Sequence, residues 1–166
     1  MRTGIALGSN LGDRLQNLRA GRDAVLALPG VSGPLLASRV YETEPVGTGP
    51  DAGAFLNAVI EVSFAGTPHE LLAGLQPIES AMGRPSRRPR NAPRTLDLDI
   101  LYVGDLVASE AELEIPHPRL HLRRFVLQPL HDIRPDLSLP GWKSNVSELF
   151  RALADPAAVV EFARNW

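Results

Sequence analysis

The stretch FLNAVIEVSF (residues 55–64), followed closely by TPHE (residues 67–70), decides the fold class. Apolar side chains occupy every second position along 55–64, and this alternation predicts a strand with one face toward a core. The other face carries Phe55 and Asn57 side by side. The second stretch has the Thr-x-x-Glu spacing of a capping box, with proline at the first helical position. We therefore expect a strand that leads directly into a helix.

Outward from this unit, strand and helix patterns alternate along the chain. Upstream, residues 2–8 predict a strand, the turn at 9–13 leads into a helix that stops at Pro29-Gly30, and residues 35–42 predict a second strand. Downstream we expect a helix from Thr67 to about Met82, with a kink or early stop at Pro77. A strand at 96–103 should follow, with a tight hairpin at Gly104-Asp105 into a strand at 106–108 and a further strand at 113–115. The remaining elements are a helix at 123–133 and one or two helices within 145–165, capped by Asn145 and Asp155. This order predicts an α+β fold, a ferredoxin-like βαββαβ sandwich with an antiparallel sheet and extra C-terminal helices.

Length and composition limit the class of protein. The 166 residues are 44% apolar and 22% charged, which is typical of a globular protein, so we expect a single domain over residues 1–166. The chain has no cysteine, no apolar run long enough to cross a membrane and no signal peptide, which favours a cytoplasmic location without a membrane partner. The net charge of −2 argues against a general nucleic-acid-binding protein. No heptad or long apolar edge indicates an obligate dimer, so we expect a monomer.

Two aspartates in LDLDIL (residues 96–101) form the sharpest local feature. On a strand, Asp97 and Asp99 share one face while Leu98 and Ile100 enter the core. Two carboxylates this close repel each other unless a cation lies between them. Mg²⁺ is a suitable cation because it takes oxygen ligands and is usually shared with substrate phosphates. The alternative is a solvated acidic face on an edge strand.

An arginine-rich loop leads directly into this acidic strand. Residues 84–94 contain no acidic residue and five arginines, which are Arg84, Arg87, Arg88, Arg90 and Arg94. Because guanidinium groups bind phosphate oxygens in bidentate fashion, the loop and the acidic pair together fit a magnesium–polyphosphate site. The alternative is a solvated surface loop. The glycines and prolines of 43–53 and 83–95 predict loops that close over substrates.

His117 stands between two prolines in PHPR (residues 116–119). Rigid flanks would fix the direction of its imidazole toward a phosphate or a ribose; the alternative is a structural turn. The sequence contains no histidine pair at zinc-ligand spacing, no G-x-x-x-x-G-K-[ST] motif and no G-x-G-x-x-G motif. If ATP binds to this chain, it does so without a standard phosphate loop.

Taken together, the motifs resemble those of the 6-hydroxymethyl-7,8-dihydropterin pyrophosphokinase family of folate biosynthesis. They are ALGSNLG (6–12), YETEPVG (41–47), FLNA (55–58), GR (83–84), PRTLDLDIL (93–101), PHPRL (116–120) and RRFVL (123–127). The combination of PRTLDLDI with a downstream PHPR is highly specific.

The resemblance implies an enzyme that transfers pyrophosphate from ATP to the hydroxymethyl group of 6-hydroxymethyl-7,8-dihydropterin and releases AMP. It also implies a ferredoxin-like fold and two Mg²⁺ ions. Asp97 and Asp99 match the metal ligands, and Arg84 and Arg94 match arginines on the triphosphate. The positions that match the nucleotide site are Gln76, Glu79, Ile100, His117 and Arg123, and those that match the pterin pocket are Thr43, Val46, Phe55, Asn57 and Phe125.

The sequence departs from the family pattern at a few positions. Asn91 replaces a tryptophan often found in the arginine-rich loop. The register of this loop against the family pattern leaves open whether Arg87 or Arg88 supplies a further arginine to the triphosphate site. Glu44 stands where some members have proline, and Phe55 where some have tyrosine.

Two other functions compete with this interpretation. A ferredoxin-like RNA-binding module would use an aromatic strand motif, which is missing from a chain with only 5% aromatic residues. A metal-dependent phosphohydrolase would differ in its products, because it would release free phosphate.

Overall fold

The computed structural model describes residues 1–44, 53–83, 94–154 and 158–166. The helices are α1 (Arg14–Leu26), α2 (Pro68–Ala81), the 3-10 helix η1 (Leu120–Leu122), α3 (Arg124–Ile133) and α4 (Val146–Ala152). The strands are β1 (Arg2–Ser9), β2 (Val31–Ala37), β3 (Val40–Thr43), β4 (Phe55–Phe64), β5 (Asp97–Val103), β6 (Ala108–Ser109), β7 (Glu114–Ile115) and β8 (Val159–Ala163). With β2 and β3 taken together as one strand, the chain follows the predicted βαββαβ order as far as β5.

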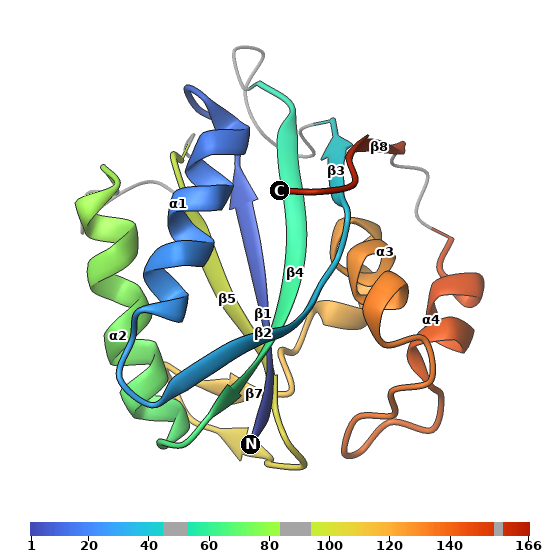
Figure 1. Cartoon of the computed structure of the whole chain (residues 1–166). Helices are drawn as coiled ribbons and strands as arrows, with labels where there is room; N and C mark the ends of the chain where they lie inside the picture. Colours follow the sequence, from blue (N-terminus) through green and yellow to red (C-terminus); the bar gives the residue numbers. More distant parts are fainter. Residues whose placement is uncertain (45–52, 84–93, 155–157) are drawn as a thin grey trace.

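The main sheet has the strand order β5-β1-β4-β3-β8, with β2 also paired to β4, and its pairings are antiparallel. Figure 1 shows α1 and α2 on one side of this sheet and α3 and α4 on the other. Local sequence starts the first two helices: Asp13 accepts a hydrogen bond from the Gln16 N–H at α1, and Thr67 and Glu70 form the predicted capping box at α2. The ferredoxin-like prediction is therefore confirmed.

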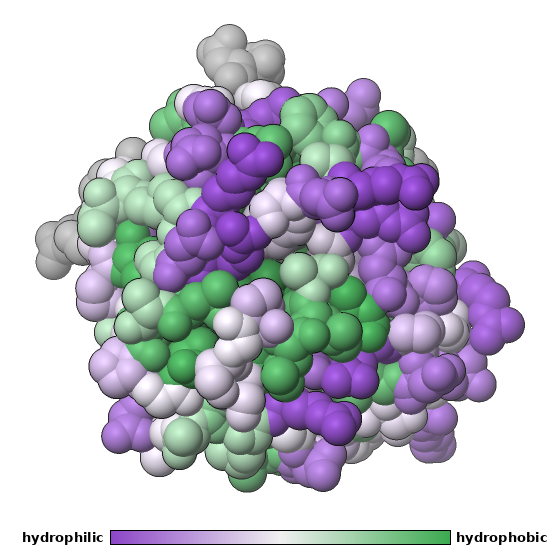
Figure 2. Space-filling model, in the orientation of Figure 1, coloured by the Kyte–Doolittle hydropathy of each residue, from purple (hydrophilic) through white to green (hydrophobic). Residues whose placement is uncertain are grey.

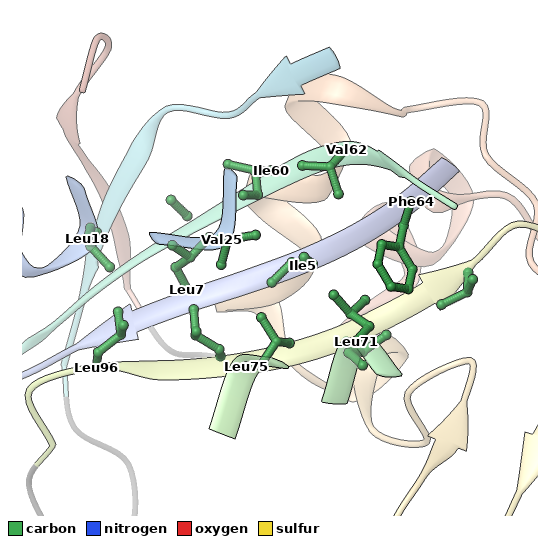
Figure 3. Packing of buried hydrophobic residues seen from close by; sticks show 14 of the residues in the cluster. Ile5, Leu7, Leu18, Val25, Ile60, Val62, Phe64, Leu71, Leu75 and Leu96 are labelled. Carbon is green, nitrogen blue, oxygen red and sulfur yellow. The ribbon is translucent and has the colours of Figure 1, made fainter. Parts of the chain in front are cut away.

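Each face of the sheet carries a hydrophobic core. Figure 3 shows the core on the α1 and α2 side, where Val25 and Leu75 pack with Leu7 of β1. On the opposite face, Val59 of β4 packs with Leu127 of α3. The alternation of β4 thus serves two cores, and the α3 side of the sheet also holds Phe55 and Asn57.

A buried polar network joins this second face to the end of α3. The Tyr102 hydroxyl donates to Glu61 Oε2 at 2.7 Å, and Arg134 Nε donates to the same oxygen at 2.8 Å. Burial alone raises the pKa of Glu61, but the hydrogen bonds from Arg134 and Tyr102 bring that pKa below its ordinary value. Gly4 makes room for the network, because a Cβ there would lie 2.2 Å from the Tyr102 ring.

Two expected elements differ in part from those observed. The strand expected over 35–42 is divided into β2 and β3, because the buried Ser38 uses its hydroxyl to accept from the Val59 N–H at 2.9 Å and so interrupts the backbone ladder. Helix α2 does not stop at Pro77 but continues to Ala81. Pro77 has no backbone N–H, so one helical hydrogen bond is missing, but its ring is exposed. Burial of Leu71 and Leu75 against the sheet holds the helix together at this point.

Two further expectations downstream are wrong. Gly104 forms the predicted turn with a φ of 51°, but the chain then leaves the sheet, and β6 pairs with β7 instead of returning along β5. The outer edge of β5 is contacted by the His117 N–H, which donates to the Leu101 carbonyl at 2.9 Å. After α4, which Asn145 caps as predicted, the expected second helix is the strand β8, because its valines pair with the open edge of β3. Asp155 lies outside the described residues.

On the face toward the viewer in Figure 2, hydrophobic residues gather below the middle, over the region where Figure 1 places β2. Leu35 of β2 is correspondingly exposed. None of the helices in the described parts of the chain has the length and apolar composition needed to cross a bilayer.

Candidate active site

A cavity of about 670 Å³ opens between the sheet and the start of α3, a volume within the usual range for small-molecule sites. Its lining combines charged residues from β5 and its flanks with aromatic and amide side chains from β4 and α3. The predicted site residues among its lining are Thr43, Phe55, Asn57, Arg94, Asp97, Asp99, Arg123 and Phe125. Eight of the predicted site residues thus meet around one cavity.

The register of three strands sets the spacing across the cavity. Gly8 of β1 pairs with Asn57 of β4 on one side and with Asp97 of β5 on the other. Neighbouring strands lie about 4.8 Å apart, so the Cα atoms of Asn57 and Asp97 are separated by about 10 Å. A Cβ on Gly8 would lie 3.4 Å from Asn57 Oδ1, so glycine leaves the floor between these side chains open. A ligand can therefore contact both the amide and the carboxylate.

Asp97 and Asp99 share one face of β5, as predicted, while Leu98 and Ile100 are buried in the opposite core. Arg94 Nη1 lies 2.6 Å from Asp97 Oδ2. Within the described residues no group of three or more His, Asp or Glu side chains is arranged to hold a metal ion. Two carboxylates fit Mg²⁺ that takes its other ligands from water and substrate phosphate, because this is how Mg²⁺ is usually bound.

His117 and Arg123 extend the charged end of the site. His117 Nε2 lies 4.0 Å and Arg123 Nη1 lies 3.8 Å from Asp99 Oδ2. Burial and the nearby Arg123 and Arg119 charges lower the pKa of His117 to about 4. The Arg119 backbone N–H donates to His117 Nδ1 at 3.1 Å, which leaves the proton of the neutral imidazole on Nε2. His117 can therefore donate a hydrogen bond from Nε2 to an anionic ligand.

The other end of the cavity is aromatic and amide-bearing. Asn57 is 7% exposed, and its Nδ2 donates to Thr43 Oγ1 at 2.9 Å, which fixes the amide plane. Phe55 and Phe125 also line the cavity, and the Arg123 guanidinium lies 5.6 Å from the centroid of the Phe125 ring. Such a surface suits a flat heterocycle whose edge carries hydrogen-bonding groups.

Four predicted nucleotide-site residues do not line this cavity, and one of them is His117, which lies beside Asp99 at the charged end. Ile100 is 7% exposed in the core beneath the sheet, so its side chain points away from Asp97 and Asp99. Glu79 is buried on α2, and its Oε1 accepts from the Leu98 N–H at 2.9 Å. Gln76 is exposed on the same helix. Val46 and Arg84 lie outside the described residues, as do Arg87, Arg88 and Asn91.

Sequence reasoning missed part of the cavity wall. Leu122 of η1 and Leu153 and Ala154 after α4 line the cavity, although apolar residues in short C-terminal elements carry no local signal of such a role. Asn10 belongs to the ALGSNLG motif, but the sequence assigned it no role beyond the turn after β1. It is 5% exposed and holds Arg94, because the Arg94 N–H donates to Asn10 Oδ1 at 2.7 Å.

The fold and the cavity together define an α+β domain of the ferredoxin-like type that can bind an anionic ligand and a flat aromatic ligand side by side. Residues 4–135 match the family model described as 7,8-dihydro-6-hydroxymethylpterin-pyrophosphokinase (HPPK). The chain belongs to this family. The match confirms the family expected from the sequence motifs and, with it, the class of enzyme, a pyrophosphokinase of folate synthesis.

Curated relatives agree with this family. The chain is 40% identical over 148 residues to the 2-amino-4-hydroxy-6-hydroxymethyldihydropteridine pyrophosphokinase of Pseudomonas aeruginosa, with 89% of each chain covered. It is 43% identical over 129 residues to the enzyme of the same name from Bacillus subtilis, covering 78% of this chain and 75% of the relative.

Longer relatives contain the same region as one part. The chain is 44% identical over 133 residues to a folate synthesis bifunctional protein of Arabidopsis thaliana, but it covers only 26% of that protein. Among solved structures, a crystal structure of HPPK-DHPS in complex with substrates matches 91% of this chain with a TM-score of 0.70 and 14% sequence identity. The chain spans about 43% of that structure, and the likeness shows the fold alone.

Proposed function

We propose that this chain transfers the pyrophosphoryl group of ATP to the hydroxymethyl group of 6-hydroxymethyl-7,8-dihydropterin, giving AMP and the pterin diphosphate. One observation carries the proposal. A single cavity joins an amide and two aromatic rings at one end to two aspartates and two arginines at the other. Transfer between a flat acceptor and a polyphosphate donor requires both ends, at the spacing that the three strands provide.

The aromatic end would bind the pterin. Phe55 and Phe125 would stack on the ring system, and Asn57 would hydrogen-bond its amide-like edge while Thr43 holds the Asn57 side chain in place. Val46 is assigned to the same pocket from the family motif alone. The Asn57–Gly8–Asp97 register would then direct the hydroxymethyl group toward the carboxylates.

The charged end would bind the triphosphate. We propose that Asp97 and Asp99 hold two Mg²⁺ ions, which neutralise charge on the phosphate oxygens when bound. Arg94 and Arg123 would donate charge-assisted hydrogen bonds to the remaining oxygens, and Arg84 is assigned the same role from the family motif. His117 would donate from Nε2 to a phosphate or ribose oxygen.

The outer edge of β5 would bind the rest of the nucleotide. The Leu98 N–H points away from β1, because it bonds to Glu79. Backbone groups alternate along a strand, so the Ile100 N–H faces the same outer edge as the Leu98 N–H. We therefore propose that Ile100 contributes its backbone N–H to the nucleotide site, not its side chain, and that Glu79 and Gln76 on α2 flank it.

The pterin hydroxyl oxygen would attack the β-phosphorus in line, and AMP would leave. Neither Asp97, which is paired with Arg94, nor His117, which has its proton on Nε2, is placed as a dedicated general base. Positioning by the strand register and stabilisation of negative charge by the arginines would supply most of the rate enhancement.

We further propose that residues 1–166 act as one monomeric domain in the cytoplasm. Two cores that share one sheet support a single domain, and the absence of cysteine suits a reducing compartment.

Calorimetry tests whether the two ends of the cavity bind the nucleotide and the pterin separately. A non-hydrolysable ATP analogue is titrated in the presence and absence of Mg²⁺, followed by the pterin. The proposal expects Mg²⁺-dependent binding of the analogue that Asp97→Ala weakens, with pterin binding retained in that variant. Binding of the analogue that is independent of both Mg²⁺ and Asp97 would remove the basis for the metal assignment.

A further inference from the structure

Asn10 lies at a junction of three segments at the edge of the site. It directly follows β1, its backbone carbonyl lies 3.3 Å from where a Cβ on Gly53 would stand, and it forms two hydrogen bonds with Arg94. Gly53 precedes β4 and Arg94 precedes β5. Asn10 therefore lies beside the segment that precedes β4 and is hydrogen-bonded to the segment that precedes β5.

The two bonds between Asn10 and Arg94 run in opposite directions. The Asn10 backbone N–H donates to the Arg94 carbonyl at 3.1 Å, and the Arg94 N–H donates to Asn10 Oδ1 at 2.7 Å. Both backbone polar groups of Arg94 are thereby engaged by one residue. With its backbone fixed, Arg94 places its guanidinium 2.6 Å from Asp97 Oδ2.

The orientation of the Asn10 side chain leaves its amide donor without a partner. Asn10 is 5% exposed, and its Nδ2 has no hydrogen-bond partner among the described residues. A buried amide that leaves its donor unpaired is unfavourable. The geometry is maintained by the bond to Arg94, since turning the amide over would bring Nδ2 against the Arg94 N–H, and two donors would face each other.

We infer that Asn10 is a positioning residue for the pyrophosphoryl transfer, which acts by fixing the backbone of Arg94. The inference rests on the role proposed above for Arg94. Loss of the Asn10 side chain would leave Arg94 in the sequence but free its backbone, so the guanidinium would no longer be held in advance at the place where the triphosphate is bound. The pterin end, built on β3, β4 and α3, would be unaffected.

A double-mutant cycle of Asn10→Ala and Arg94→Ala tests this inference, with the transfer rate and the pterin dissociation constant measured for each variant. We expect Asn10→Ala to reduce kcat about 10- to 100-fold with pterin affinity within about twofold of the unaltered chain. In the Arg94→Ala background the same change should cost less than about threefold, because the residue through which Asn10 acts is already gone. Asn10→Asp keeps an acceptor oxygen for the Arg94 N–H and should recover most of the lost rate.

The control is Thr67→Ala, which removes a side chain that also accepts a backbone N–H, at the start of α2. It should lower thermal stability without changing kcat. If Asn10→Ala cannot be purified, Asn10→Ser replaces it, since serine suits a turn but its hydroxyl is too short to span the bond.

Equal rate losses from Asn10→Ala in both backgrounds, or a parallel loss of pterin affinity, would overturn the inference and leave Asn10 as a structural residue. These outcomes are separate from failure of the proposed role of Arg94, which would appear as full activity of the Arg94→Ala single variant.

Discussion

Replacement of Asn57 by alanine tests the assignment of the amide and aromatic end of the cavity to the pterin. Asn57 is 7% exposed and gives one Nδ2 hydrogen to Thr43 Oγ1 at 2.9 Å. Its Oδ1 and second Nδ2 hydrogen remain for a ligand. The alanine variant therefore removes a buried donor and acceptor from one end of the cavity, while Asp97 and Arg94 at the other end keep their contacts.

The size of the effect follows from the burial of Asn57. A polar ligand edge that is buried without its partner costs about 1–3 kcal/mol. This corresponds to a rise of about 5- to 150-fold in the pterin dissociation constant. The affinity for a non-hydrolysable ATP analogue with Mg²⁺ should change by less than about twofold, because Asn57 and Asp97 are two strands apart.

Calorimetric titrations with each ligand separately provide the comparison. Asn145→Ala is the matched control, because Asn145 Oδ1 also accepts a backbone N–H, at 2.9 Å, but caps α4 outside the cavity lining. It should lower thermal stability and leave both affinities unchanged. Equal losses of pterin and nucleotide affinity in Asn57→Ala would refute the reasoning and make Asn57 a structural residue.

Three further predictions concern the carboxylates, the aromatic wall and the buried network. Asp97→Ala or Asp99→Ala should each abolish AMP release at saturating Mg²⁺, because each removes a proposed metal ligand; full activity of both variants would exclude the metal assignment. Phe125→Leu should weaken pterin binding by about 2- to 12-fold in calorimetry, the loss of roughly 0.5–1.5 kcal/mol of aromatic contact, and an unchanged affinity would contradict stacking. Glu61→Gln should lower the unfolding free energy at pH 7 by about 1–3 kcal/mol in urea titrations. Because the pKa of Glu61 is lowered on folding, its stabilising contribution is present above the ordinary pKa of 4.5 and is lost as the pH falls below that value. The difference in unfolding free energy between the variant and the unaltered chain should therefore narrow in acid. A difference in unfolding free energy that stays constant with pH would contradict this.

Features set by local chemistry were predictable from the sequence. The capping box at Thr67 and the strand at 55–64 depend on residues within a few positions of one another, and both were found as predicted, although both faces of β4 are buried and not one. The shared face of Asp97 and Asp99 follows from the two-residue period of a strand in the same way. At the charged end of the cavity, local chemistry thus accounts for the shared face of Asp97 and Asp99.

Features set by tertiary pairing were not predictable. The sequence of β8 gives a weak local signal, and it is a strand because the edge of β3 is open to it. The break at Ser38 depends on a backbone N–H of Val59, 21 residues away. Glu79 is similar: the family resemblance assigns it to the nucleotide site, but its contact with the Leu98 N–H, 19 residues away, carries no local signal in the sequence.

Analysis of the products tests the central claim most directly. The purified chain is incubated with ATP and Mg²⁺, with and without 6-hydroxymethyl-7,8-dihydropterin, and nucleotides, pterin diphosphate and free phosphate are separated and quantified. We expect AMP and the pterin diphosphate in equal amounts, only when the pterin is present, and no release of phosphate. Formation of ADP, release of free phosphate, or formation of AMP without the pterin would contradict pyrophosphoryl transfer to the pterin.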